Sequence, residues 1–178
     1  VESLGRMVGN MVGFPKWKHL FGFKEPIRRK TPRSAEIFAA AVSETYKKID
    51  ERSETLLGMK RLPEYDSDRC SVWLEQNGDV FISVHGTDSV GDVVEDTKLL
   101  AGATVESPDV EALVRKLLDE GKKVDCGGHS LGTQYITNLP DDLLARLDEV
   151  YLFNPASSPT QSSAYLKKVL AMDNAYWF

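Results

Sequence analysis

Apolar residues recur at helical spacing between residues 34 and 52. The positions that would share one helix face are Ile37, Phe38, Ala41, Val42, Tyr46 and Ile49. Steps of three or four residues are typical of an amphipathic helix, and Ser34 is a suitable N-cap. The pattern therefore predicts a helix from Ser34 to about Arg52, followed by a polar loop that contains Gly58 and Pro63.

Two strands joined by a tight turn are predicted next. Residues 70–75 place Val72 and Leu74 on one face, whereas residues 79–85 are almost continuously apolar, as in a strand buried on both faces. The dipeptide Asn77-Gly78 between them is a strong hairpin signal. The two segments therefore predict a β-hairpin.

From residue 89 onward, helical and extended patterns alternate. Helices are expected over 89–101, 108–120 and 141–147, strands over 123–127 and 149–154, and a helix end or a strand over 165–172. Strands that alternate with helices imply parallel βαβ units. We therefore expect an α/β fold in which a mostly parallel sheet is flanked by helices.

The start of the chain differs in composition from the rest. Residues 1–33 hold eight Lys or Arg residues and two Glu, although the whole chain has a net charge of −5. Residues 1–32 are interpreted as a basic arm or linker and residues 33–178 as the folded domain. The arm fits docking on an acidic protein or an anionic membrane surface, or packing of its aromatic residues on the domain. Its basic residues are too sparse to favour nucleic acid.

Cysteines and histidines indicate neither a disulfide framework nor a metal site. Cys70 and Cys126 lie in strand-like apolar runs and are expected to be buried free thiols. The three histidines are scattered, and no nucleotide-binding motif is present, so no cofactor is expected. No apolar run approaches the roughly 18 residues of a membrane span.

The segment Gly128-His129-Ser130-Leu131-Gly132 has the form Gly-x-Ser-x-Gly. It follows a predicted strand, and no helix breaker occurs after it until Pro140. In a nucleophile elbow the serine lies on a tight strand-to-helix turn, so the residues two positions away must be small, as Gly128 and Gly132 are. Ser130 is therefore the predicted nucleophile, and the backbone N–H of Leu131 is a predicted oxyanion donor.

A second candidate feature is His85-Gly86-Thr87 at the end of the buried strand. The loop after such a strand supplies the other oxyanion donor in α/β hydrolases, so the N–H or hydroxyl of Thr87 is expected to join Leu131. Alternatively, the triplet only ends the strand and caps the next helix. Asp92 and Asp96 share a helix face, where they either support the Thr87 loop or form a solvated face.

In this order, the motifs resemble the class 3 (fungal-type) lipases of the α/β-hydrolase superfamily. That family carries an Arg/His-Gly-Thr/Ser triplet, an acidic pair, a Gly-His-Ser-Leu-Gly elbow, a strand ending near a proline and a downstream Asp. The corresponding residues here are His85 to Thr87, Asp92 and Asp96, Gly128 to Gly132, Phe153-Asn154-Pro155 and Asp173. The resemblance covers residues 35–173 and implies an α/β-hydrolase fold, hydrolysis of lipid or other carboxylic esters, and Asp173 as the triad acid.

The general base of such a triad is not found. The family order is Ser, Asp, His, and no histidine follows Ser130 up to Phe178. His85 precedes the serine and His129 points away from it in an elbow, so neither is expected to be the base. Three explanations are open. In the first, the chain continues past Phe178 and supplies the histidine, since residues 175–178 stop without a turn or polar tail. In the second, the fold is a non-catalytic structural or binding subunit, for example of a virion, attached through its arm. In the third, a partner chain donates the histidine.

Overall fold

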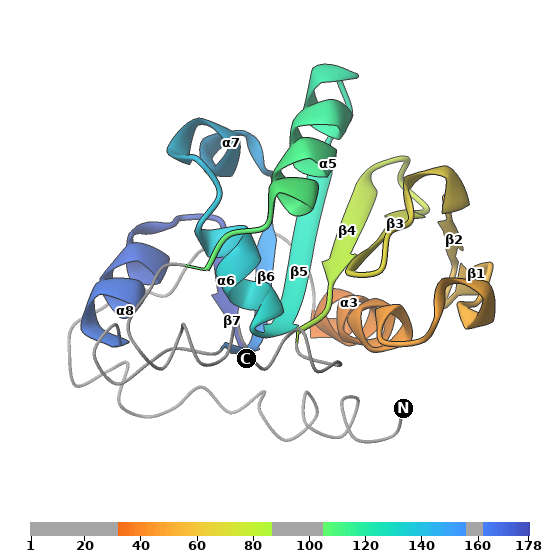
Figure 1. Ribbon diagram of the computed structural model, residues 1–178, viewed down its shortest axis with the longest axis horizontal. Helices are drawn as coiled ribbons and strands as arrows, with labels where there is room; N and C mark the ends of the chain where they lie inside the picture. The colour runs from red at the N-terminus through yellow and green to blue at the C-terminus, as the bar shows by residue number, and fades with distance from the viewer. Residues whose placement is uncertain (1–31, 87–104, 156–161) are drawn as a thin grey trace.

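The computed structural model describes residues 32–86, 105–155 and 162–178, and these residues form one seven-stranded sheet (Figure 1). The strands are β1 (Thr55–Leu56), β2 (Met59–Arg61), β3 (Cys70–Leu74), β4 (Val80–Val84), β5 (Val124–Ser130), β6 (Val150–Pro155) and β7 (Ala175–Trp177). They lie in the sheet in their chain order. Strands β1 to β4 pair antiparallel and β4 to β7 pair parallel. The expected α/β class is confirmed, with a mixed sheet.

The hairpin of β3 and β4 turns at Asn77-Gly78, as predicted. Gly78 has a φ of 89°, and the side-chain oxygen of Asn77 accepts the Asp79 N–H. All of β4 is buried, which confirms the apolar reading of that strand. In β3, Val72 and Trp73 point to opposite faces and both are fully buried, so both faces of this strand are covered near its middle. Leu74 lies on the same face as Val72, as predicted, but at the strand end it is 36% exposed.

The predicted polar loop around Gly58 contains a second hairpin. Strands β1 and β2 are joined by Leu57 and Gly58, which have φ angles of 49° and 88°. A two-residue turn with two positive φ values matches the right-handed twist of the flanking strands. The sheet therefore extends two strands beyond the predicted hairpin.

The described helices are α3 (Pro32–Thr45), α5 (Pro108–Asp119), α6 (Gly132–Thr137), α7 (Asp141–Arg146) and α8 (Ser162–Ala171), with single 3₁₀ turns η1 (Ile49–Glu51) and η2 (Pro63–Tyr65). Helix α5 agrees with prediction. Helix α3 begins at Pro32, because proline is favoured in the first helical turn. It ends at Thr45, not at Arg52. The predicted arm and the predicted helix over 89–101 lie outside the described residues.

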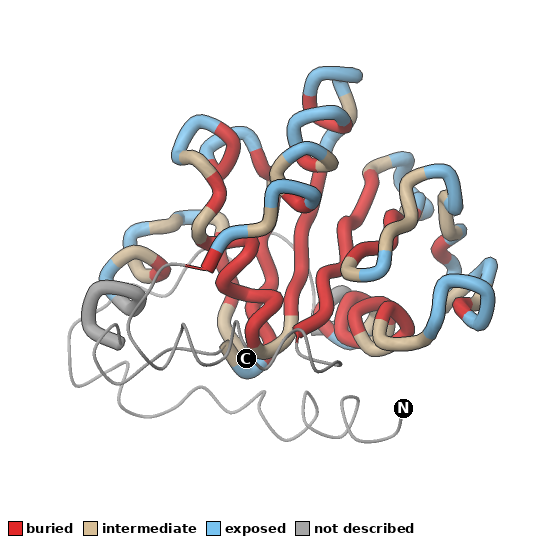
Figure 2. The backbone as a smooth tube through the Cα atoms, viewed as in Figure 1, coloured by how far each residue is buried: buried red, intermediate tan, exposed pale blue. Residues whose placement is uncertain are grey.

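The helices cover the sheet as two layers (Figure 1). Parallel strands that follow one another in order, joined by crossovers of one hand, place all crossover helices on the same face. Accordingly, α5, α6, α7 and α8 contribute to the apolar core that contains Val72, Ile82 and Cys126. The opposite face is covered by α3, which precedes the sheet in the chain. The central strands are buried along their length, whereas β1 and β2 are largely exposed or half-buried (Figure 2).

The α3 face of the sheet is aromatic. Phe38 of α3 stacks on Phe81 at 4.0 Å between ring centroids, and Tyr151 packs edge-on against Phe38. Phe81 fits there only because Gly127 has no side chain: a Cβ on Gly127 would lie 2.5 Å from the Phe81 Cζ. This packing fixes β5 against α3 one residue before the Gly-x-Ser-x-Gly segment begins.

Both cysteines are buried free thiols, as predicted. Burial raises the pKa of the Cys70 thiol to about 12 and raises the pKa of the Cys126 thiol as well, so both are unreactive at neutral pH. None of the described helices combines the length and the apolar character needed to cross a bilayer.

Candidate active site

Ser130 occupies a sharp turn between β5 and α6. It is the last residue of β5, and α6 begins at Gly132. Its φ is 53°, in the left-handed region that residues with a side chain avoid at a cost of about 1–3 kcal/mol. The strand–turn–helix context predicted for a nucleophile elbow is therefore present, with backbone strain at the serine itself.

The two glycines of the segment are required by close backbone packing. A Cβ on Gly128 would lie 2.8 Å from the Gly132 carbonyl carbon and oxygen. A Cβ on Gly132 would lie 2.6 Å from the Val84 oxygen and 2.9 Å from the His85 oxygen. The start of α6 is thus pressed against both β5 and the end of β4, which explains why small residues flank Ser130.

The end of β4 lies directly against this turn. A Cβ on Gly86 would lie 3.0 Å from the Leu131 nitrogen and 2.8 Å from the His129 oxygen. Among the described residues, no acceptor is present for the Leu131 N–H, and its role as an oxyanion donor stays a prediction. Thr87, Asp92 and Asp96 lie outside the described residues, and their supporting roles stay predictions.

Both histidines at this edge of the sheet are engaged by groups other than Ser130. His129 Nδ1 lies 2.8 Å from the Tyr46 hydroxyl, and burial lowers the pKa of His129. In His85, Nδ1 lies 2.7 Å from the backbone oxygen of Gly86. Its Nε2 lies 2.5 Å from the backbone oxygen of Asp68. None of these three contacts joins a histidine to Ser130.

Asp173 does not lie near Ser130. It is exposed in the turn between α8 and β7, at the amino end of β7, whereas Ser130 ends β5 at the carboxyl edge of the parallel strands. The register aligns Cys126, Val150 and Ala175, and the four steps from Cys126 to Ser130 span about 13 Å. One imidazole cannot bridge that separation by hydrogen bonds. The structure therefore does not bring Asp173 and Ser130 together, because β7 follows Asp173 and leaves it at the amino edge of the parallel strands.

A group of carboxylates lies at the same amino edge. Single oxygens of Glu75, Asp79 and Asp125 lie within 4.8 Å of one another. Asp79 also accepts a hydrogen bond from the Asn77 amide in the β3–β4 turn. These residues are separated from Ser130 by most of the length of β5, so they take no part in the candidate site.

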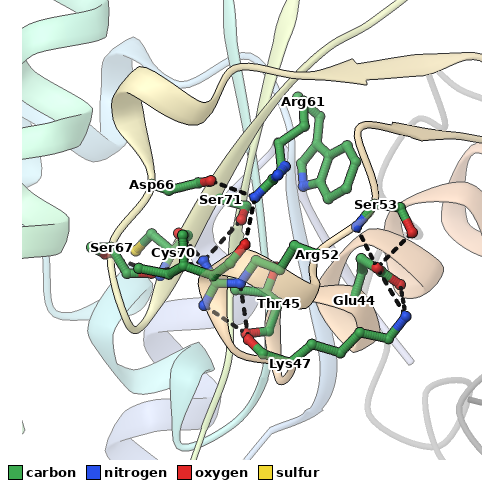
Figure 3. Close-up of polar contacts among 12 residues, drawn as sticks. Glu44, Thr45, Lys47, Arg52, Ser53, Arg61, Asp66, Ser67, Cys70 and Ser71 are labelled. Carbon is green, nitrogen blue, oxygen red and sulfur yellow. Dashed lines mark hydrogen bonds and ion pairs between the residues drawn. The ribbon is translucent and has the colours of Figure 1, made fainter.

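The loop that contacts His85 is held by a buried arginine (Figure 3). Arg52 is 4% exposed and donates hydrogen bonds to five backbone carbonyls and one hydroxyl. The acceptors are the oxygens of Thr45, Lys47, Ser67, Asp68 and Cys70 and the hydroxyl of Ser71. Burial lowers the pKa of Arg52, and the nearby Asp66 opposes that effect. Arg52 therefore joins the end of α3 to the loop before β3.

Glu44 secures the other side of this junction (Figure 3). One oxygen of its carboxylate accepts hydrogen bonds from the Ser53 N–H, the Ser53 hydroxyl and the Lys47 ammonium. Burial alone would raise the pKa of Glu44, but these hydrogen bonds outweigh it and hold the pKa below its ordinary value of 4.5. A carboxylate of this kind stabilises the fold above its unfolded-state pKa, and that stability is lost as pH falls through its folded-state pKa.

Glu44→Gln should therefore lower the free energy of unfolding more at pH 7 than at pH 3. Urea unfolding at the two pH values measures the difference. Glu36→Gln, on the exposed side of the same helix, is the matched control and should have little effect at either pH. Equal losses for Glu44→Gln at both pH values would contradict this prediction.

Tyr46 and Arg52 are site-edge residues that sequence reasoning did not single out. Tyr46 fell on the apolar face of the predicted helix, which signalled burial but not a polar contact. Arg52 was expected at the helix end, and no sequence signal marks it as buried.

Comparison of the chain with protein-family models, curated proteins and solved structures gives no match.

Proposed function

We propose that this chain is an α/β-hydrolase-type domain that cleaves carboxylic esters, including lipid esters, with Ser130 as the nucleophile. The observation that carries the proposal is the left-handed conformation of Ser130 between β5 and α6. Such strain persists only where the surrounding structure holds it, and it is common at functional sites. The close contacts of Gly128 and Gly132 are the packing that holds this turn.

In this proposal the Ser130 hydroxyl oxygen attacks the ester carbonyl and an acyl-enzyme forms as the alcohol leaves. The Leu131 N–H, with Thr87 as the second donor, stabilises the oxyanion of the tetrahedral intermediate. A general base must take the serine proton, since an unassisted hydroxyl is a weak nucleophile. No histidine occurs between Leu131 and Phe178, so the base would come from a continuation of the chain or from a partner chain.

A second candidate function is a structural or binding subunit with a hydrolase fold. The engagement of His85 and His129 by other groups favours it, as does the position of Asp173 on the opposite edge. In that case the basic arm, and not Ser130, would carry the function through an acidic partner or an anionic membrane surface.

A fluorophosphonate probe separates the two candidates. The natural full-length protein is incubated with the probe and its intact mass is measured. One adduct per chain is expected, absent in Ser130→Ala and retained in the control Ser43→Ala on α3. Hydrolysis of p-nitrophenyl acetate and laurate then compares short and lipid-like acyl chains. A full-length protein that gains no adduct would exclude the esterase proposal and favour the structural subunit.

A further inference from the structure

The Tyr46 hydroxyl bonds to the ends of two strands. Tyr46 directly follows α3, and its oxygen accepts the Gly86 N–H at 2.9 Å. The same oxygen lies 2.8 Å from His129 Nδ1. Gly86 follows β4 and His129 lies near the end of β5, so one hydroxyl joins the helix layer to both strand ends at the candidate site.

The Tyr46 ring contacts the rings of two histidines. Its centroid lies 4.9 Å from the His85 ring and 5.8 Å from the His129 ring, the second pair being edge-on. Aromatic pairs prefer such separations and tilts. The ring is thus fixed by packing, and the hydroxyl is presented in one position at the strand ends.

This position is next to the groups that would bind an oxyanion. His129 immediately precedes Ser130, and the Gly86 Cα packs against the Leu131 nitrogen, as the 3.0 Å approach of a Cβ there shows. A shift of Gly86 relative to the turn would therefore change the space beside the Leu131 N–H. Oxyanion stabilisation depends on donors held at 2.7–3.1 Å from the developing charge, a general requirement of such sites.

We propose that Tyr46 is a positioning residue: its hydroxyl sets the spacing between the end of β4 and the nucleophile turn, and so the geometry of the oxyanion site. The role rests on the proposed esterase function. It acts on the transition state rather than on substrate binding, because Tyr46 bonds to Gly86, which packs against the Leu131 nitrogen, and to His129, which precedes Ser130. Loss of the hydroxyl should thus reduce kcat and leave KM almost unchanged.

The test compares Tyr46→Phe with wild type in the natural full-length protein. The change keeps the ring and removes only the hydroxyl. We expect kcat for p-nitrophenyl ester hydrolysis and the rate of fluorophosphonate labelling to fall about tenfold or more, with KM within about twofold. Independently of activity, hydrogen exchange of the Gly86 amide, measured by NMR, should accelerate about tenfold or more. Tyr65→Phe, which removes a hydroxyl bonded to Glu120 on the surface, is the matched control and should change neither.

The outcomes are distinct. Unchanged kcat and labelling in Tyr46→Phe, in an enzyme whose wild type reacts, would overturn the positioning role and leave the esterase proposal intact. Unchanged exchange of the Gly86 amide would overturn it as well. A wild-type protein that does not react with the probe would overturn the proposed function and the catalytic role of Tyr46 together. A lower kcat/KM that arises from a raised KM with unchanged kcat would assign Tyr46 to substrate binding and not to positioning.

Discussion

Gly132→Ala should destabilise the domain by about 3 kcal/mol, the upper range for overpacking a tight interior. The added methyl group would lie 2.6 Å from the Val84 oxygen and 2.9 Å from the carbonyl carbon and oxygen of His85. These are backbone atoms of a central, fully buried strand and its end, so they cannot move aside as a flexible side chain would. The start of α6 must shift instead, and the turn at Ser130 shifts with it.

Urea unfolding at equilibrium measures this effect. Gly121→Ala is the matched control: Gly121 has a φ of 77°, and a Cβ there has no neighbour within 4 Å. The control isolates the cost of a side chain in the left-handed region, about 1 kcal/mol. If Gly132→Ala cost no more than Gly121→Ala, the close packing of α6 on β4 would be refuted.

Arg52→Met should have a comparable effect, again about 3 kcal/mol or more. Methionine keeps much of the apolar stem but removes every donor from five carbonyls around the end of α3 and the loop before β3. Each buried acceptor left without a donor costs about 1–3 kcal/mol unless water reaches it. Because Asp68 is among these acceptors and also contacts His85, the change should also loosen the end of β4.

Thermal and urea unfolding of Arg52→Met should be compared with Arg146→Met. Arg146 makes a surface ion pair with Asp119, so the same substitution there should cost less than about 0.5 kcal/mol. Arg52→Lys keeps the charge but has one nitrogen in place of the planar fork, and it should recover little of the lost stability. Full recovery with lysine would show that charge, and not the geometry of the guanidinium, holds the loop.

Local signals predicted the central part of the fold. Asn77-Gly78 marked the β3–β4 turn because a positive φ is inexpensive at glycine. The helical pattern over residues 108–120 located α5. The turn at Ser130 was predicted because the two small residues that it requires, Gly128 and Gly132, lie within five consecutive positions. In each case the physical cause lies within a few residues of its effect.

The errors arise where distant residues decide the structure. The strand pair β1 and β2 is too short to show alternation, and Leu57 gives no turn signal although it adopts a positive φ. Asp173 was predicted to be the triad acid because it follows Ser130 in the sequence. Its edge of the sheet is set by the pairing of β7 with β6, which the order of residues does not encode. Arg52 and Tyr46 act through backbone groups that become neighbours only after folding.

The agreement between chain order and strand order has a consequence for biosynthesis. Each strand from β2 to β7 pairs with the strand made just before it, and within the described residues no strand has to insert between two earlier ones. A chain that emerges from the ribosome at about 5–20 residues per second can therefore add strands one at a time to a growing edge. The β3–β4 hairpin can form before β5 has been synthesised. Strand β5, which ends at Ser130, can then pair with the free edge of β4 as soon as it emerges.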